Sequence, residues 1–212
     1  MAKTCIFILA RGGSTRIKNK NLSIIGGKTL IERTLDTCKE LPYDTFVFTD
    51  SEKIKKISLQ HGAEVRDKVY ESPSGVHHTK SELLFYNESI LADVIILLQV
   101  TSPFRDSSKV KIWIKDFLKS GNDCGVAAHP MRGFFYQGKC LYNQKDRDYN
   151  STGEKTVYKE TGSFYIFKKQ NILLNHFVGG KIGVYEDPYN VDINTQKDLE
   201  KARGFYAETF CK

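Results

Sequence analysis

The stretch TCIFILARGGSTRIKNKN (residues 4–21) joins a short apolar run to a loop of glycines, hydroxyl side chains and cations. The run at 4–10 is apolar without alternation, which predicts a strand buried on both faces of a sheet. The loop leaves the carboxyl end of that strand, the edge at which open parallel sheets bind ligands. From this position alone, the loop is either a phosphate-binding loop or an ordinary basic turn.

Outward from this stretch, short apolar segments alternate with amphipathic ones. Strands are predicted at 4–10, 44–50, 63–66, 93–100 and 124–128, and helices at 29–41, 52–61, 79–91 and 109–121. TKSE (79–82) matches a capping box, in which Glu82 would reach back to the helix start. The alternation predicts a parallel sheet with helices on both faces. The expected fold class is therefore α/β, with three layers (α/β/α).

The pattern changes after residue 129. Residues 133–143 have the pattern of a hairpin, and the polar residues 144–160 that of an arm or loop. Strands at 161–167 and 181–186 and a helix at 194–210 complete the predicted elements. We expect one domain over 1–212, with 130–160 as a projecting hairpin or arm insertion.

The composition narrows the classes of function. Hydrophobic residues make up 40% of the 212 residues, enough for a packed core. The net charge of +7 comes from lysines spread over the polar faces of predicted helices, which favours a solvated surface over a nucleic-acid partner. A basic chain can also bind a small anion such as a nucleoside triphosphate. The sequence shows no apolar run that would span a bilayer and no signal peptide, so we expect a cytoplasmic protein without a membrane partner.

Other chemistries receive little support from the sequence. The five cysteines form no CxxC pair and are expected to be reduced packing residues. The five histidines lack the spacing of zinc ligands, and no GxSxG motif indicates a serine nucleophile.

The loop after the first strand has the residue types that phosphate binding requires. Glycines let backbone amides turn toward an anion, hydroxyls add donors, and cations neutralise the negative charge that builds up on a leaving phosphate. These residues are Gly12, Gly13, Ser14, Thr15, Arg11, Arg16 and Lys20. Their spacing matches neither the P-loop nor the GxGxxG fingerprint.

The loop ARGGSTRIKNKN (10–21) resembles the first signature of the acylneuraminate cytidylyltransferase family, approximately A-R-x-x-S-K-R-I-P-x-K-N. Three further stretches resemble the family's later motifs and follow in its order: LLQVTSPFR (97–105), ETGSFYIF (160–167) and VDINTQKDL (191–199). The four motifs span most of the chain. The Q-G-D-x-P motif of the branch that acts on the eight-carbon acid of lipopolysaccharide is replaced here by LQVTSP, which favours the sialic-acid-like branch.

The resemblance implies a mostly parallel, Rossmann-like nucleotidyltransferase sheet and a projecting lobe that mediates homodimer formation. It implies CTP and a sugar acid as substrates, with Mg²⁺ as cofactor. In the family, a hydroxyl of a sialic-acid-like 3-deoxy-ulosonic acid attacks CTP, pyrophosphate leaves, and a CMP-activated acid forms. Two alternatives stay open: a different acid or a phosphonate as acceptor, and a nucleotide- or glycan-binding homologue with impaired catalysis.

The resemblance also assigns roles, position by position. Catalysis falls to Arg11, Lys20 and Asp192. Nucleotide binding falls to Arg11, Gly12, Gly13, Ser14, Thr15, Arg16, Lys20 and Asn21. Substrate binding falls to Gln99, Thr101, Ser102 and Arg105, with Arg105 also a candidate brace for its loop, and metal binding to Asp192 and Asn194.

The chain departs from the family pattern at several of these positions. Thr15 stands where the family has a lysine, and Asn194 where a second metal carboxylate is expected. The segment 66–82 lacks the family's R-P-x-x-L-A-x-D pattern, and Arg66 and Ser81 are candidates for remnants of the base-binding positions. Selectivity for cytosine is therefore inferred from the resemblance alone.

Overall fold

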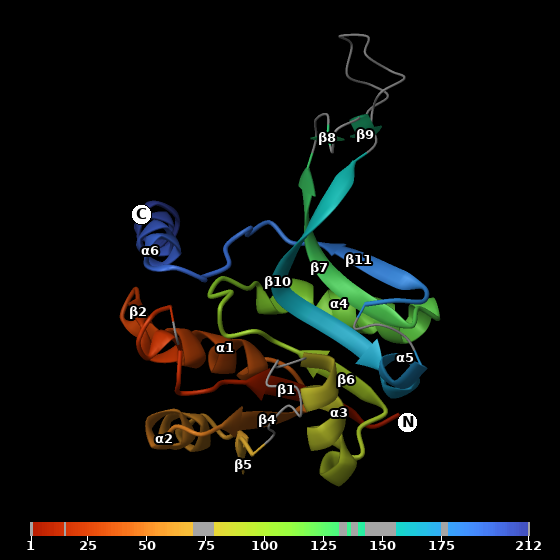
Figure 1. Cartoon of the computed structure of the whole chain (residues 1–212), viewed down its shortest axis with the longest axis horizontal. Helices are drawn as coiled ribbons and strands as arrows, with labels where there is room; N and C mark the ends of the chain where they lie inside the picture. Colours follow the sequence, from red (N-terminus) through yellow and green to blue (C-terminus); the bar gives the residue numbers. More distant parts are fainter. Residues whose placement is uncertain are drawn as a thin grey trace.

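The structure, a computed structural model, describes residues 2–14, 16–69, 79–131, 135–136, 140–142, 156–174 and 178–211. Its centre is a seven-stranded sheet (Figure 1). Across the sheet the strands are β11 (Ile182–Glu186), β7 (Cys124–Met131), β10 (Val157–Lys168), β6 (Val94–Leu97), β1 (Thr4–Leu9), β4 (Asp44–Thr49) and β5 (Glu64–Asp67). β10 runs antiparallel to both of its neighbours, whereas every other pair in this sheet is parallel.

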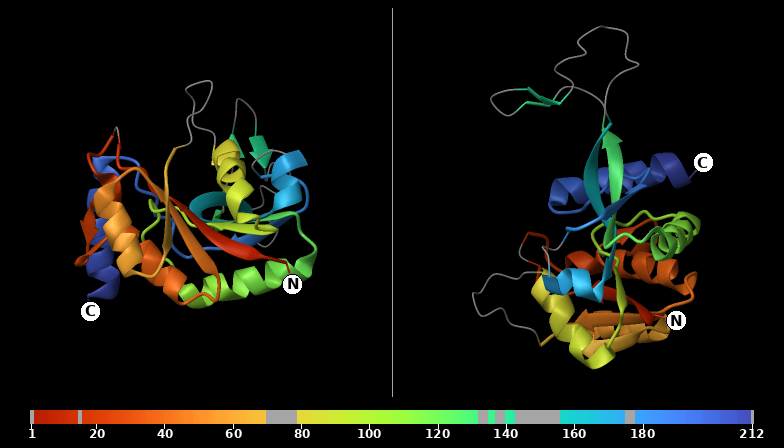
Figure 2. Two further views of the ribbon diagram at one scale, coloured as in Figure 1. Left: turned by 90° about the horizontal axis from the view of Figure 1, so that it is seen from below. Right: turned by 90° about the vertical axis from the view of Figure 1, so that its right-hand side faces the viewer.

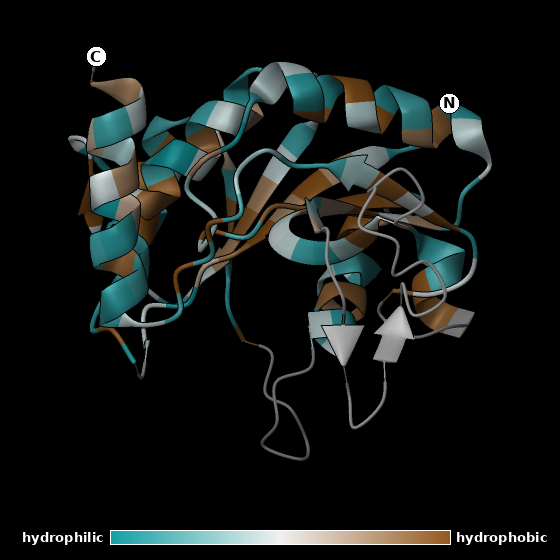
Figure 3. Ribbon diagram, turned by 90° about the horizontal axis from the view of Figure 1, so that it is seen from above, coloured by the Kyte–Doolittle hydropathy of each residue, from teal (hydrophilic) through white to brown (hydrophobic). Residues whose placement is uncertain are grey.

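Helices cover both faces of the sheet, as Figure 2 shows. One face carries α1 (Leu30–Lys39), α2 (Glu52–Gln60) and α4 (Ser107–Ser120), and the other carries α3 (Thr79–Ile90) and α5 (Lys169–Leu174). Residues of β1 alternate between the two cores: Ile6 and Ile8 pack toward α1 and α4, and Phe7 toward α3. The strands are accordingly the brown, hydrophobic layer in Figure 3. This arrangement confirms the predicted three-layer α/β/α fold.

Most predicted elements are present with small changes in length. The last helix, α6 (Gln196–Phe210), matches the prediction, and the hairpin is present as β8 (Phe135–Tyr136) paired with β9 (Cys140–Tyr142). β7 and β10 extend beyond the body of the sheet, with β8 and β9 at their far end (Figure 1). Of the polar stretch predicted as an arm or loop at 144–160, residues 144–155 lie outside the described residues, and the prediction is wrong for residues 157–160, which form the start of β10. α5 and the short elements between β1 and α1 were not predicted.

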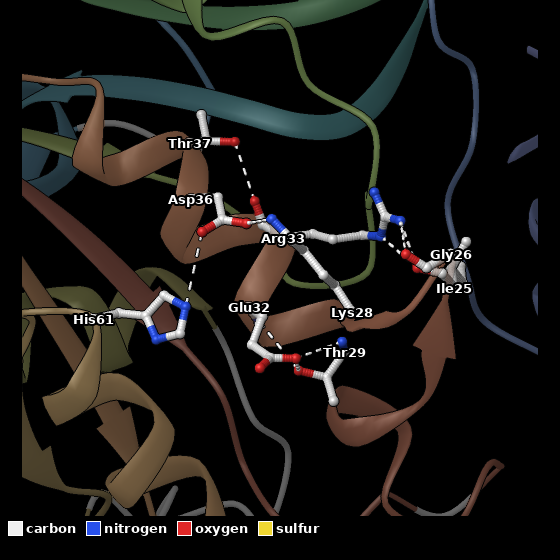
Figure 4. Close-up of polar contacts among 9 residues, drawn as sticks. All are labelled: Ile25, Gly26, Lys28, Thr29, Glu32, Arg33, Asp36, Thr37 and His61. Atoms are coloured by element: carbon white, nitrogen blue, oxygen red, sulfur yellow. Dashed lines mark hydrogen bonds and ion pairs between the residues drawn. The ribbon is translucent and has the colours of Figure 1, made fainter. Parts of the chain in front are cut away.

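The short elements between β1 and α1 are a 3-10 turn, η1 (Lys20–Leu22), and a small hairpin of β2 (Ile24–Ile25) and β3 (Lys28–Thr29). Figure 4 shows what holds them. Thr29 and Glu32 form a capping box at the start of α1. Arg33, one turn further on, donates to the carbonyl oxygen of Ile25 at 2.9 Å and so ties the hairpin to the helix. The β2–β3 hairpin, which follows the glycine loop, is therefore fixed to the start of α1.

Three of the four cysteines whose side chains are described confirm the prediction of packing residues, and the exposed Cys211 does not. Cys5, Cys38 and Cys124 are buried and free, and Cys211 is free and exposed. Burial raises the pKa of the Cys38 thiol to about 12, so it stays protonated and unreactive. Within the described part of the chain, no helix has the length and apolar character to cross a membrane.

Candidate active site

The glycine loop after β1 is folded against the end of the neighbouring strand β4. The Ala10 amide donates to the Phe48 carbonyl at 2.9 Å, and the Gly12 amide donates to the Asp50 carboxylate at 2.5 Å. A Cβ at Gly12 would lie 2.9 Å from Cβ of Ser51, so only glycine permits this approach. Around Gly13, by contrast, a Cβ would meet nothing within 4 Å, so this part of the loop faces open space.

Two asparagines shape the second half of the loop. Asn19 adopts a left-handed backbone conformation (φ 54°) that starts η1, a conformation that asparagine tolerates better than most residues. The buried Asn21 donates from its amide nitrogen to the Arg11 carbonyl at 2.9 Å. Asn21 therefore fixes the loop's backbone, in addition to lining the pocket beside it.

Lys20 connects the glycine loop to the acidic segment before α6. Its Nζ donates to the carbonyl oxygen of Ile193 at 2.9 Å, across 173 residues of sequence. The pKa of Lys20 is lowered by burial; Asp192 counteracts this, and Arg16 and Arg11 add to it. Lys20, Arg16 and Arg11 thus lie close enough to interact electrostatically. Such a group of neighbouring cations is what binding of a polyphosphate requires.

Gly162 is the point at which the other three motifs meet. Its φ of +74° is left-handed, and a Cβ there would lie 3.2 Å from the Gln99 amide oxygen. The same Cβ would lie 3.7 Å from the Ser102 hydroxyl and 4.0 Å from the Asp192 carboxyl carbon. The segment that carries Asp192 is held here because the Ile193 amide donates to the Thr101 carbonyl at 2.9 Å.

Gly162 lies in an irregular part of β10, where pairing with β7 shifts register between Glu160 and Tyr165. The buried carboxylate of Asp187 holds this bulge: it accepts hydrogen bonds from Thr161 Oγ1 at 2.8 Å and from Ser163 Oγ at 2.5 Å. These two residues flank Gly162, so Asp187 positions Gly162 without lying in either pocket described below.

Arg105 does not contact the site as predicted for a substrate-binding residue. It donates to the Ser163 carbonyl at 2.7 Å and to the Gln99 carbonyl, and burial lowers its pKa to about 10. These contacts brace the 97–105 loop against the bulge, which is the second role considered for it. Ser102 is also interior, 1% exposed, with its hydroxyl donating to the Thr161 carbonyl at 3.3 Å.

A pocket of about 220 Å³ opens beside the glycine loop. Gln99 and Thr101 line it together with Arg11 and Asn21 of the loop. The sequence analysis assigned Gln99 and Thr101 to the sugar side of the cleft. The structure places them on one wall with Arg11 and Asn21, which were predicted to bind the nucleotide, and the assignment to the sugar side stays a prediction.

A second pocket, of about 590 Å³, lies at the acidic segment. Six of its lining residues are Lys159, Thr161, Asn190, Asp192, Asn194 and Lys201. Glu160 and Asp198 line it as well, so this pocket carries charges of both signs.

The metal-binding prediction rests on Asp192 and Asn194. Asp192 is exposed, and the Asn194 amide nitrogen donates to its carboxylate at 2.6 Å. The next carboxylate, Asp198, forms a capping box with Thr195 at the start of α6, and its hydrogen bond to the Thr195 hydroxyl lowers its pKa. No cluster of three or more acidic, histidine or cysteine ligands is present among the described residues.

Several residues of the site escaped the sequence analysis. Lys68 and Glu82 form an ion pair in the wall of the pocket beside the glycine loop. Because α3 already begins at Thr79, Glu82 does not close the predicted capping box. The candidate remnants of base-binding positions lie elsewhere: Arg66 pairs with Glu64 on the surface, Ser81 is exposed, and neither is among the residues that line this pocket. The sequence signal that could have revealed this pair is Lys68, a cation directly after the end of β5 at the ligand-binding edge of the sheet.

The structure also shows the exposure of two further residues that were predicted to bind the nucleotide. Ser14 is half-buried in the loop and Arg16 is exposed, whereas Thr15 lies outside the described residues.

A mostly parallel α/β sheet with a cationic glycine loop after its first strand, in contact with an acidic segment, is the arrangement of the nucleotidyltransferase class. The chain belongs to the cytidylyltransferase family, whose model matches residues 5–210. This confirms the resemblance found in the sequence.

Named relatives and a solved structure agree with this family. The CMP-N,N'-diacetyllegionaminic acid synthase of Legionella pneumophila is 30% identical, covering 79% of each chain. The pseudaminic acid cytidylyltransferase of a Campylobacter jejuni strain (serotype O:2) is 29% identical, covering 97% of each. The structure of CMP:2-keto-3-deoxy-manno-octonic acid synthetase complexed with CTP superposes with a TM-score of 0.72 over 98% of this chain and 99% of that one, at 17% identity. At this low identity, the similarity to the synthetase structure is evidence for the fold alone.

Proposed function

We propose that this protein transfers CMP from CTP to a hydroxyl of a sialic-acid-like 3-deoxy-ulosonic acid, with release of pyrophosphate. One observation carries the proposal: Lys20 of the glycine loop bonds to the backbone next to Asp192, so the phosphate-binding loop and the acidic segment form one site. The relatives named for legionaminic and pseudaminic acid support the class of acceptor.

The chemistry is mainly positioning and charge neutralisation. The acceptor hydroxyl oxygen forms a bond to the α-phosphorus and loses its proton, while the bond to the bridging oxygen breaks and pyrophosphate departs. Arg11, Arg16 and Lys20 offset the charge that develops on the departing group. Because position 162 is glycine, no side chain is inserted there between Gln99 and Asp192.

The donor set fits Mg²⁺ in the manner usual for nucleotide sites, where one or two protein oxygens act together with substrate phosphates. Asp192 would provide the carboxylate and Asn194 an amide oxygen. When bound, Mg²⁺ would stabilise negative charge on the phosphates. Because Asn194 carries no charge, we expect weaker metal binding than a pair of carboxylates would give.

The remaining expectations also stay proposals. We propose a homodimer formed through the arm at 130–160, supported by the extension of β7 and β10 beyond the sheet and by the exposed Tyr158 on β10. We propose a cytoplasmic location, where CTP is available, and neither nucleic acid nor membrane as a partner.

The Asn194 to Asp192 hydrogen bond favours one alternative: a nucleotide-binding homologue with impaired catalysis. An acceptor other than a sialic-like acid, such as a phosphonate, is the second alternative. Both are tested by one assay, pyrophosphate release from CTP and Mg²⁺ with a panel of N-acetylneuraminic, legionaminic, pseudaminic and 3-deoxy-manno-octulosonic acids and a phosphonate. Release stimulated by a sialic-like acid supports the proposal; CTP binding without release for any acid rejects it.

A further inference from the structure

A buried ion pair lies in the wall of the pocket beside the glycine loop. Lys68 follows β5 and Glu82 lies in the first turn of α3, and their side chains are 10% and 7% exposed. Both line the pocket that also contains Arg11 and Asn21. Two consecutive elements, β5 and α3, thus bring one donor group and one acceptor group to the same wall.

A buried ion pair is seldom the arrangement that stabilises a fold most. Removing two charges from water costs several kcal/mol per ion, and well-packed apolar residues are often at least as stable. Lys68 also lies near Arg11, which lowers its pKa in the same direction as burial, while Asp50 raises it. Both burial and the neighbouring Arg11 thus disfavour the charged form of Lys68. A charged pair placed in such surroundings indicates a role in ligand binding rather than in stability.

The pair keeps hydrogen-bonding capacity for a ligand. Among the described residues, the one hydrogen bond of the Lys68 ammonium goes to Glu82 Oε1. An ammonium has three donors and a carboxylate two acceptor oxygens, so each group can bond a further partner. Leu9 and Leu97 line the same pocket, so a flat ligand there would meet apolar surface as well as the two charged groups.

We propose that Lys68 and Glu82 read the base of the nucleotide and select cytosine. Cytosine presents an exocyclic amine beside an unprotonated ring nitrogen: the carboxylate accepts from the amine and the ammonium donates to the ring nitrogen. Uracil presents a carbonyl oxygen and a ring N–H at the same positions, so both contacts would be mismatched. This inference rests on the proposed function for the identity of the nucleotide.

The placement in the pocket favours the base over the acceptor acid. The pocket wall continues through Arg11 into the phosphate-binding loop, as a nucleotide requires. Glu82 supplies an acceptor that the exocyclic amine of a base can use and that the carboxylate of a sugar acid cannot.

Calorimetric binding of CTP, UTP and ATP, without acceptor, tests the inference. In the wild type we expect CTP to bind more tightly than UTP by about tenfold or more. Glu82→Gln supplies an amide that can donate to the uracil carbonyl, so the CTP-to-UTP preference should fall by about tenfold. Glu40→Gln, which removes a carboxylate from an exposed pair with Lys111, is the matched control and should leave the preference unchanged.

A second variant protects the test against misfolding. Lys68→Met/Glu82→Leu replaces the pair by apolar groups of similar size, which should preserve the melting temperature and abolish the preference. A folded Glu82→Gln protein with the wild-type preference overturns the inference, as does a wild type that binds the three nucleotides equally. A wild type that prefers CTP, loses that preference in Glu82→Gln and converts no acid contradicts only the proposed function.

Discussion

Replacing the buried Asp187 by asparagine removes a negative charge from the centre of three hydrogen bonds. The carboxylate accepts from Thr161 Oγ1 at 2.8 Å, from Ser163 Oγ at 2.5 Å and from the Tyr189 amide at 2.9 Å. It also lies close enough to Arg105 to favour the charged guanidinium. The substitution keeps the shape of the side chain, so the effect isolates charge and acceptor number.

The structure sets the expected magnitude. A hydrogen bond to a charged group contributes about 1.5–3 kcal/mol, and one between neutral groups about 0.5–1.5 kcal/mol. An amide offers one oxygen to these donors, so at least one bond is lost and the others weaken. We expect the free energy of unfolding to fall by about 2–4 kcal/mol. For a chain of this length the melting temperature should fall by about 5–15 °C.

The assay combines thermal unfolding with steady-state turnover at a temperature where the variant is folded. Because Thr161 and Ser163 flank Gly162, we expect kcat to fall as well as stability. Asp36→Asn is the matched control: it removes an exposed carboxylate paired with Lys28 at 2.7 Å and should cost less than about 1 kcal/mol. An Asp187→Asn protein with wild-type melting temperature and kcat would refute the role given to Asp187.

Three further predictions concern the glycine loop and the acidic segment. Lys20→Ala and Asp192→Ala should each lower turnover by about 10²-fold, the scale of losing one electrostatic stabiliser; an unchanged steady-state rate removes that residue from the site. Burial lowers the pKa of Lys20, so it loses its charge at a lower pH than an ordinary lysine, and CTP affinity should decline with rising pH below the usual lysine range. Lys20→Arg should move that decline to higher pH in a titration of binding, and an unmoved profile assigns it to another group. Asn194→Asp should lower the Mg²⁺ concentration for half-maximal rate, measured by metal titration, and a higher requirement contradicts metal binding at this position.

The sequence predicted the sheet because its strands are strongly apolar and its helices amphipathic. The run at 4–10 and the helix at 29–41 needed no tertiary information, since burial on two faces leaves a direct compositional signal. The hairpin between β1 and α1 was missed because its strands are two residues long and are held by Arg33, a contact set by the tertiary fold.

Within the candidate site, motif position was predictable and side-chain direction was not. Lys20 and Asp192 were expected in one site from the order of the family motifs, and the structure brings their segments into contact. For Arg105 the sequence left two roles open, substrate binding and bracing of its loop, and only its acceptors, here backbone carbonyls, distinguish them in favour of bracing. Glu82 fitted a helix-capping pattern equally well, and only its distance in space to Lys68 distinguishes the two roles.

Phosphorus NMR of the reaction mixture tests most directly whether the protein transfers CMP from CTP to a sialic-like acid. With CTP, Mg²⁺ and a sialic-like acid, we predict that the triphosphate signals are replaced by those of pyrophosphate and of one phosphodiester that joins CMP to the acid. Release of orthophosphate with formation of CDP, or unchanged CTP with every acid under conditions where CTP binds, would contradict it.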